Sequence, residues 1–339
     1  MTPDEIARAI EAFLCERTGA PTARVEGLRR LTGGASRETW SLDAVIEGST
    51  GAAPVPLPLI LQRDVRGAPK GMSRALEFRL LQTAYDAGVI APEPMFMGDA
   101  SLGGEFFLVR RIDGETLPRR LLRDDGYASA RAALSAQLGR IAAGIHALPL
   151  DGLPELSRPP EGTDPRAFEV GRHEQIFRAI APEPHPAFEL ALRWLRRNIE
   201  GQPAGRVALV HGDFRMGNVL FGPEGARAML DWELAHAGDP MEDLAWMCVR
   251  SWRFGGALPV GGIGTREEFY AAYEAASGRP VDSERVRWWE VFGNLRWGII
   301  CLSQAQTYLS GHSNSVELAS IGRRTAETEW ELLELMGEL

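Results

Sequence analysis

Hydrophobic and polar positions are arranged in two different ways along this chain. In the first third, short apolar runs are separated by loops rich in glycine, proline and polar residues, as in residues 57–62 and 105–112. From Leu117 onward, apolar residues recur every three or four positions over longer stretches, as in residues 128–147 and 284–309. The first pattern is typical of strands and the second of amphipathic helices. The sequence therefore predicts an α+β fold.

These patterns predict an antiparallel sheet with two helices, followed by a mainly helical region. We expect strands within residues 25–46, 57–62, 95–97 and 105–112. We expect helices over residues 4–17, 72–87, 128–147, 188–199, 284–309 and 315–336, with another starting at Asp239-Pro240. The change of pattern near residues 113–117 predicts an N-terminal lobe over residues 1–112 and a helical C-terminal lobe over residues 113–339.

Charge and cysteine content exclude several classes of protein. A net charge of −9 and a pI near 5.4 lack the basic footprint of a nucleic-acid-binding surface. The three cysteines are too far apart to suggest a disulfide framework or a zinc site. The N-terminus lacks a basic region and apolar core, and no apolar run is long enough to span a membrane. We therefore expect a cytoplasmic protein that binds neither nucleic acid nor membrane, with an oligomeric state that the sequence does not indicate.

Three polar residues in the segment VHGDFRMGNVLFGPEGARAMLDW, residues 210–232, are placed on turns between apolar runs. Asp213 follows the first run, Asn218 comes five residues later, and Asp231 follows a further apolar run. The spacing is similar to that of the catalytic segment of kinases, in which an Asp orients or deprotonates a hydroxyl. An Asn and a second Asp there hold Mg²⁺, which prefers oxygen ligands. The sequence predicts Asp213 as the catalytic residue and Asn218 and Asp231 as metal ligands.

Two other interpretations of this segment stay open. Asp and Asn favour turns in their own right, so the three residues could be turn formers only. Alternatively, His211 and Asp213 could be metal ligands of a hydrolase, with His236 as the nearest further candidate. In the kinase-like interpretation, His211 braces the loop and does not react.

A glycine turn in the first lobe predicts a hairpin that covers a nucleotide. Gly33, Gly34 and Ser36 lie between two strand-like runs. Small residues at such a turn let backbone N–H groups approach phosphate oxygens. An ordinary hairpin would show the same pattern, so the turn gains weight only together with the catalytic segment.

The blocks HGDFRMGNVLF and LDWELAHAGDPMEDLAW resemble the catalytic signature of the aminoglycoside and choline phosphotransferase superfamily, the small-molecule relatives of protein kinases. The resemblance covers most of the chain, including the glycine turn, residues 57–63 and 72–87, and IHALP at 145–149. It implies a protein-kinase-like bilobal fold with a small antiparallel-sheet N-lobe and a larger, mainly helical C-lobe. It also implies Mg²⁺-dependent transfer of the γ-phosphoryl group of ATP or GTP to a hydroxyl of a small molecule.

The resemblance supports the three roles given above and adds others. It implies that Glu77 is the helix glutamate that holds the phosphate-binding lysine of the neighbouring strand. It also implies a hinge that contacts adenine over residues 109–112, with Val109, Arg110 and Ile112.

The strand lysine itself is missing. Residues 57–63 end in Gln62 and Arg63, and Lys70, the only lysine of the chain, lies in a Gly/Pro loop. An arginine can supply positive charge and a bidentate phosphate contact. We therefore predict Arg63 in the lysine's role, with Gln62 as the alternative register and Lys70 as the other candidate.

The sequence leaves more than one class of acceptor open. The run LDWE…GDPMEDLAW and the arginine near the strand end resemble the subgroup related to the kinase-like domains of some acyl-CoA dehydrogenases. This resemblance implies a hydroxyacyl-CoA acceptor. The alternatives are an aminoglycoside acceptor, or a nucleotide-binding pseudokinase that has lost turnover together with its strand lysine.

Two clusters in the helical lobe have both a functional and a structural interpretation. Asp239, Glu242 and Asp243 could form an acidic patch for a cationic acceptor. In the structural interpretation, Asp239 caps the following helix and Asp243 braces the catalytic loop. Aromatic residues at helical spacing could line an acceptor pocket, although such residues are more often core; these are Trp288, Trp289, Trp297 and Tyr308.

Overall fold

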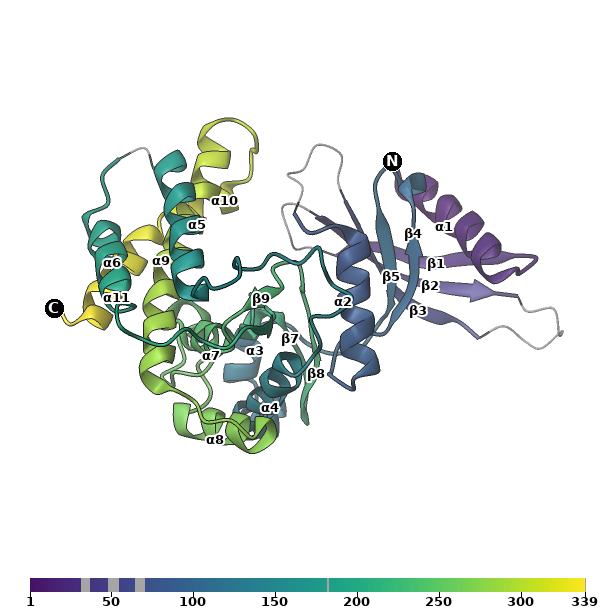
Figure 1. The fold of residues 1–339 in the computed structure, drawn as a ribbon. Helices are drawn as coiled ribbons and strands as arrows, with labels where there is room; N and C mark the ends of the chain where they lie inside the picture. The colour runs from purple at the N-terminus through teal and green to yellow at the C-terminus, as the bar shows by residue number, and fades with distance from the viewer. Residues whose placement is uncertain (32–36, 48–54, 65–70, 182, 339) are drawn as a thin grey trace.

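The computed structural model describes residues 1–31, 37–47, 55–64, 71–181 and 183–338. A sheet-containing half and a larger helical half lie side by side, as Figure 1 shows. This arrangement confirms the predicted α+β class. The glycine turn with Gly33, Gly34 and Ser36, and also Lys70, lie outside the described residues, so their roles stay predictions.

A five-stranded antiparallel sheet forms the N-terminal half. Its strands lie in the order β1-β2-β3-β5-β4. Their bounds are β1 (Ala23–Leu31), β2 (Arg37–Ile46), β3 (Leu57–Asp64), β4 (Pro94–Gly98) and β5 (Phe106–Arg110). The strands β1 and β2 are the two arms of the predicted hairpin.

Different helices cover the two faces of this sheet. On one face, Leu59 and Leu61 of β3 pack in one apolar cluster with α1 (Pro3–Thr18). On the other face, Ile60 packs against the cluster that includes α2 (Arg74–Asp86), the helix nearest the helical half (Figure 1). Successive side chains of a strand point to opposite faces, so each residue of β3 is directed either to α1 or to α2.

The helical half is built around one long central helix. Trp288, Trp289 and Trp297 of this helix are buried, which confirms their structural interpretation, whereas Tyr308 is 37% exposed. The α-helices of this half are α3 (Pro118–Arg123), α4 (Ala128–His146), α5 (Pro165–Ile180), α6 (Pro186–Arg197), α7 (Met241–Cys248), α8 (Arg266–Ser277), the central α9 (Ser283–Leu309), α10 (Val316–Gly322) and α11 (Thr325–Met336). Within the described ranges, no helix is long and apolar enough to cross a membrane.

The prediction of one helix over residues 315–336 is wrong, because the helix is interrupted between α10 and α11. Gly322 lies so close to α9 that an added Cβ would come within 2.5 Å of the Ala305 side chain. The Thr325 hydroxyl donates a hydrogen bond to the Gly322 carbonyl at 2.8 Å. The break lets both short helices pack against α9.

Short paired strands hold the predicted catalytic segment. The strand β6 (Ala208–Val210) pairs with β9 (His236–Gly238), and β7 (Val219–Gly222) pairs with β8 (Gly225–Met229). The loop between β6 and β7 carries Asp213 and contains the 3₁₀ turn η3 (Met216–Asn218). The loop between β8 and β9 carries Asp231. The two strand pairs thus bring both loops to the same place.

Candidate active site

Asp213 is held in the β6–β7 loop by three hydrogen-bond donors. The indole N–H of Trp246 donates to its Oδ1 at 2.8 Å, and Arg215 Nε lies 3.0 Å from both carboxylate oxygens. Asn218 Nδ2 donates to Oδ2 at 2.6 Å. Burial alone would raise the pKa of Asp213, but Arg215 and the Trp246 indole outweigh it and hold the pKa below its usual range. The carboxylate is therefore ionised at neutral pH and fixed in orientation.

Asp243 of α7 anchors the backbone of the same loop. Its carboxylate accepts hydrogen bonds from the N–H groups of His211 at 2.7 Å and Gly212 at 2.9 Å. The ring of His146 in α4 lies on the same carboxylate, with Nε2 3.0 Å from Oδ2. Gly212 has a φ of 75°, and an added Cβ would come within 2.2 Å of a backbone oxygen, so this tight turn requires glycine. The bracing role expected of Asp243 is the one the structure shows.

The neighbouring acids Asp239 and Glu242 are also buried and paired. Asp239 accepts a hydrogen bond from the N–H of Met241 at 3.1 Å, so it caps the start of α7 as predicted. Glu242 lies between the His236 ring at 3.1 Å and the Arg296 guanidinium at 3.0 Å. Both acids are at most 3% exposed, so they do not form an acidic patch for a cationic acceptor.

His236 contributes a stability that depends on pH. Burial alone would lower the pKa of His236, but the charge and hydrogen bond of Glu242, helped by Glu169, raise it from 6.5 to about 9. Because the folded chain holds this proton more tightly than the unfolded chain, the stabilisation is complete below pH 6.5 and disappears as the pH rises through about 9.

We therefore expect His236→Asn to be less stable than the wild-type protein near neutral pH. At high pH the two proteins should be similarly stable, because the wild-type protein then no longer has the protonated histidine. The difference in the free energy of unfolding between the two proteins should be roughly 1 to 3 kcal/mol near neutral pH, should shrink as the pH rises toward 9, and should be nearly absent above it. Urea unfolding across this pH range measures it. His312→Asn, at an exposed position, is the control, and a difference that is constant with pH would contradict the prediction.

Asn218 and Asp231 are brought next to Asp213. The Nδ2 group of Asn218 donates hydrogen bonds to the carbonyl and the carboxylate of Asp213. The Oδ1 atom of Asn218 accepts no hydrogen bond within the described chain and is therefore available to a ligand. The N–H of Leu230 donates to the Asn218 carbonyl at 2.8 Å, which joins the two loops directly before Asp231. The backbone of Asp231 has a φ of 64°, which is rare outside glycine and typical of functional sites.

The chemistry of this pair fits a magnesium ion. Burial raises the pKa of Asp231 to about 6, with Glu233 and Asp213 adding repulsion, and its side chain keeps 41% exposure. A divalent cation would relieve the repulsion among these carboxylates. The described residues contain no cluster of three or more His, Cys, Asp or Glu that could hold a metal ion. Magnesium commonly takes only one or two protein oxygens beside substrate phosphates, so one carboxylate and one amide suffice. The hydrolase interpretation, which needs further His or carboxylate ligands, has no support among these residues.

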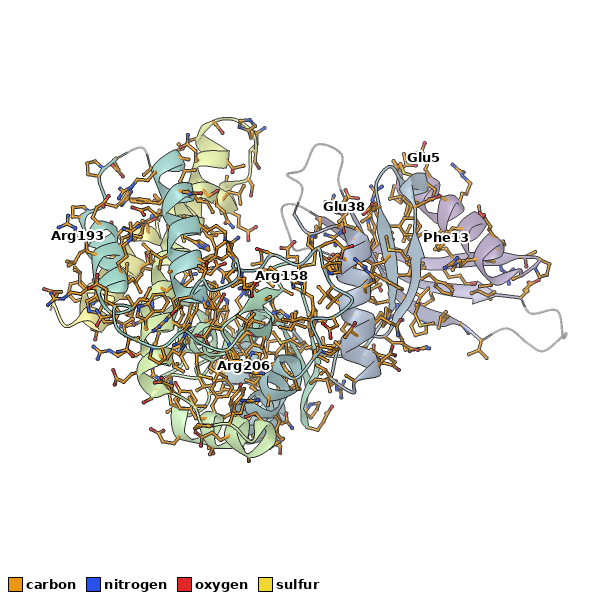
Figure 2. All side chains as sticks on the ribbon, viewed as in Figure 1. Glu5, Phe13, Glu38, Arg158, Arg193 and Arg206 are labelled. Carbon is orange, nitrogen blue, oxygen red and sulfur yellow. The ribbon has the colours of Figure 1, made fainter. Side chains whose placement is uncertain are left out.

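The helix glutamate is present, but Arg63 does not reach it. Glu77 of α2 is 2% exposed and contacts Arg74 at 2.8 Å and Arg37 at 3.1 Å. Arg63 points to the α1 face of the sheet, where its Nε donates to Glu38 at 2.8 Å and its Nη1 to the Leu102 carbonyl at 2.7 Å. Glu38 is labelled in Figure 2. The expected placement of Arg63 beside Glu77 is therefore wrong, because adjacent residues of a strand face opposite sides.

The predicted hinge follows β5. Val109 is buried within the strand, and Arg110 is tied to Glu93 through its backbone N–H at 2.8 Å and through its side chain. Beyond Arg111, whose N–H donates to Pro58, the N–H of Ile112 makes no backbone hydrogen bond within the described chain. Unpaired backbone groups of this kind are suited to a planar ligand edge.

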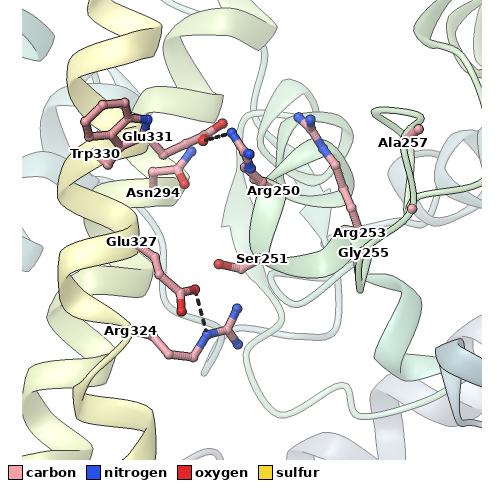
Figure 3. Close-up of a pocket in the computed structure, with 11 residues that line it drawn as sticks. Arg250, Ser251, Arg253, Gly255, Ala257, Asn294, Arg324, Glu327, Trp330 and Glu331 are labelled. Carbon is pink, nitrogen blue, oxygen red and sulfur yellow. Dashed lines mark hydrogen bonds and ion pairs between the residues drawn. The ribbon is translucent and has the colours of Figure 1, made fainter. Parts of the chain in front are cut away.

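A cavity of about 730 Å³ lies beside the catalytic loop, between the 3₁₀ turn η4 (Arg250–Arg253) and α11 (Figure 3). Its lining includes three arginines, Arg250, Arg253 and Arg324, and the acids Glu327 and Glu331. Trp252 of η4 links the cavity wall to Asp213, because the Arg215 guanidinium lies 4.8 Å from its ring centre. Asp213, Asn218 and Asp231 do not line this cavity, which is connected to Asp213 through Trp252 and Arg215.

Comparison with known proteins decides the family. Residues 27–289 match the model of the phosphotransferase enzyme family. This chain belongs to that family. The chain is also 28% identical over 298 residues to acyl-CoA dehydrogenase family member 10 of Mus musculus. That match covers 80% of the chain but 27% of the relative, so the chain spans about a quarter of the relative's length.

Solved structures of the phosphotransferase family share this fold. A Ralstonia eutropha protein assigned as an aminoglycoside phosphotransferase superposes with a TM-score of 0.72 and 21% identity, over 98% of each chain. The aminoglycoside phosphotransferase APH(4)-Ia, solved with AMP-PNP and hygromycin B, superposes with a TM-score of 0.60 and 19% identity, over 97% of this chain and 98% of the other. These likenesses confirm the predicted protein-kinase-like bilobal fold.

Three residues of the candidate site were not predicted from the sequence. Arg37 contacts Glu77, and Arg215 and Trp246 hold Asp213. Arg215 lies two residues after Asp213 in the block HGDFRMGNVLF, so its contact with Asp213 could have been predicted from this spacing. Arg37 and Trp246 come from other parts of the chain, and nothing in their local sequence distinguishes them.

Proposed function

We propose that this chain transfers the γ-phosphoryl group of ATP or GTP to a hydroxyl of a small molecule. The observation that carries the proposal is the fixed, ionised carboxylate of Asp213 beside Asn218 and Asp231. Phosphoryl transfer requires mainly positioning and electrostatic stabilisation, and this constellation supplies both. Membership of the phosphotransferase family and the AMP-PNP complex of one structural neighbour support the same reaction.

Asp213 orients the attacking hydroxyl and accepts its proton as the new O–P bond forms and the bond from the γ-phosphorus to the leaving nucleoside diphosphate breaks. Its low pKa favours orientation before the transition state and proton transfer late in it. Asn218 and Asp231 would hold Mg²⁺, which when bound neutralises charge on the phosphates. Residues 109–112, with Val109, Arg110 and Ile112, would contact the base of the nucleotide. Gly33, Gly34 and Ser36 would cover its phosphates.

The lining of the cavity between η4 and α11 favours an anionic acceptor. Arg253 uses Nε and Nη2 on the Cys248 carbonyl, and its Nη2 also lies 3.4 Å from Glu290. Arg324 uses Nε on Glu327, so each arginine keeps N–H groups without a partner in the described chain. Guanidinium groups of this kind bind phosphate and carboxylate oxygens. Such a lining supports a hydroxyacyl-CoA acceptor, as does the similarity to acyl-CoA dehydrogenase family member 10, more than an aminoglycoside, which is cationic. The pseudokinase alternative is less favoured, because Asp213, Asn218 and Asp231 are assembled.

We expect Arg324→Gln to raise the KM for an anionic acceptor by about tenfold, the effect of one charged hydrogen bond, with kcat and nucleotide binding unchanged. The acceptor is first identified in a screen with coupled ADP detection. The screen compares hydroxyacyl-CoA thioesters, sugars, homoserine, choline-like amines and aminoglycosides. Arg323→Gln, at the exposed neighbouring position, is the matched control. A preference for aminoglycosides, with no effect of Arg324→Gln, would overturn the anionic assignment.

A further inference from the structure

The face of the β2–β3 pair that looks toward α2 carries one strand arginine among the described residues, Arg37. In the strand register Arg37 lies opposite Asp64, and Glu38 lies opposite Arg63. Asp64 contacts Arg74 of α2 at 2.9 Å, which fixes the α2 face. Arg37 therefore shares that face, whereas Glu38 and Arg63 form their ion pair on the face toward α1.

Arg37 bridges α2 and the segment that follows β8. Its Nη1 lies 3.1 Å from Glu77 and 3.9 Å from Asp231, and its Nη2 lies 2.6 Å from Glu233. Its side chain keeps 12% exposure. Arg74, the other cation on Glu77, is 1% exposed and is held between Glu77 and Asp64, so it is not placed to meet a ligand.

We propose that Arg37 takes the place of the missing strand lysine and binds the phosphates of the nucleotide. The proposal rests on the phosphotransferase function proposed above, and it replaces the three candidates offered by β3 and the loop after it with a residue of β2. Glu77 contacts Nη1 of the guanidinium, and Glu233 contacts Nη2. A phosphate group would take the place of Glu233, whose side chain is 29% exposed.

An arginine suits this position for a geometric reason. A guanidinium presents N–H groups along two edges, so it can bind a carboxylate and a phosphate at once, whereas an ammonium acts as a compact point charge. Its neighbours Glu77, Asp231 and Glu233 are all acidic, so Arg37 also offsets repulsion between these carboxylates and an incoming polyphosphate. Gln62, which lies on the same face opposite Thr39, is neutral and lacks this capacity.

The test compares ligands with and without phosphates by isothermal titration calorimetry. We expect Arg37→Ala to weaken ADP binding in the presence of Mg²⁺ by about 10- to 100-fold, the effect of a charged hydrogen-bonded contact, and to leave adenosine binding unchanged. Arg37→Lys should restore part of the affinity for ADP. Arg30→Ala, at an exposed position of β1, should bind both ligands as the wild-type protein does.

Three results would overturn the assignment of Arg37. Unchanged ADP binding by Arg37→Ala would show that it does not contact phosphates. Equal weakening of ADP and adenosine binding, or no recovery in Arg37→Lys, would indicate a structural role. If the wild-type protein bound no nucleotide at all, the proposed function itself would fail, which is a separate outcome. Should Arg37→Ala not fold, Arg37→Gln provides the same comparison without the charge.

Discussion

Replacing Asp213 by Ala is expected to reduce kcat for phosphoryl transfer by about 10²- to 10⁴-fold, the usual effect of a general base or an orienting carboxylate. The hydroxyl would lose both its proton acceptor and its alignment, whereas contacts to the nucleotide base would be retained. Adenosine affinity should therefore stay close to the wild-type value. Steady-state kinetics with coupled ADP detection, together with calorimetric binding, measure the two effects separately.

Asp213→Asn is the variant that separates chemistry from folding. It keeps the shape of the side chain and one acceptor oxygen for the Trp246 indole, but its NH₂ group cannot accept from Asn218. The loss of thermal stability should therefore be smaller than in Asp213→Ala, while turnover falls as strongly. Asp125→Ala, at an exposed position, controls for loss of a carboxylate elsewhere. Turnover by both Asp213 variants at the wild-type rate would contradict the catalytic role.

Replacing Asp243 by Ala is expected to have the largest effect on stability. The change would remove a fully buried carboxylate that accepts hydrogen bonds from His211 and Gly212 and contacts the His146 ring. Breaking one partner of such a buried charged network costs about 3 to 5 kcal/mol. Turnover should be lost as well, because the loop that carries Asp213 would no longer be anchored.

Urea unfolding of Asp243→Ala measures this loss, and Asp243→Asn should lie between it and the wild-type protein. The asparagine keeps one oxygen for the loop N–H groups but loses the negative charge that His146 faces. Asp86→Ala, at an exposed position of α2, is the control. A change in the free energy of unfolding below about 1 kcal/mol, within the range of ordinary surface substitutions, would contradict the anchoring role.

The catalytic block could be predicted because its information is local. Asp213, Asn218 and Asp231 lie within 19 residues of one another, between short apolar runs that form β6, β7 and β8. Their spacing was enough to predict that they lie on neighbouring loops. The bracing role of Asp243 was also readable, since an acid in the first turn of a helix commonly serves the backbone beside it.

The phosphate-binding cation could not be predicted in this way. Gln62 and Arg63 are neighbours in β3, and a shift of one residue exchanges the faces they point to. The face is fixed only by the pairing of β3 with β2, in which Arg63 lies opposite Glu38. Arg37 is distant in sequence from both Glu77 and Glu233, so its role depends on contacts that the local sequence does not encode.

The cavity proposed for the acceptor could not be predicted from the sequence for a similar reason. Its walls come from η4 and α11, together with Asn294 of α9, segments separated by dozens of residues. The aromatic residues of α9 suggested a pocket there but are mostly core. The three arginines of the cavity are ordinary surface residues by sequence, and only the fold places them together.

The central claim is that this chain transfers a phosphoryl group to a hydroxyl at Asp213. Mass spectrometry of reactions with the acceptor found in the screen tests it most directly, with wild-type protein, Asp213→Asn, and wild-type protein plus EDTA run in parallel. We expect wild-type protein to yield one phosphorylated acceptor for each ADP formed, and the other two reactions to yield none. Phosphorylated acceptor formed equally by Asp213→Asn, or ADP formed by wild-type protein without any phosphorylated acceptor, would contradict the account.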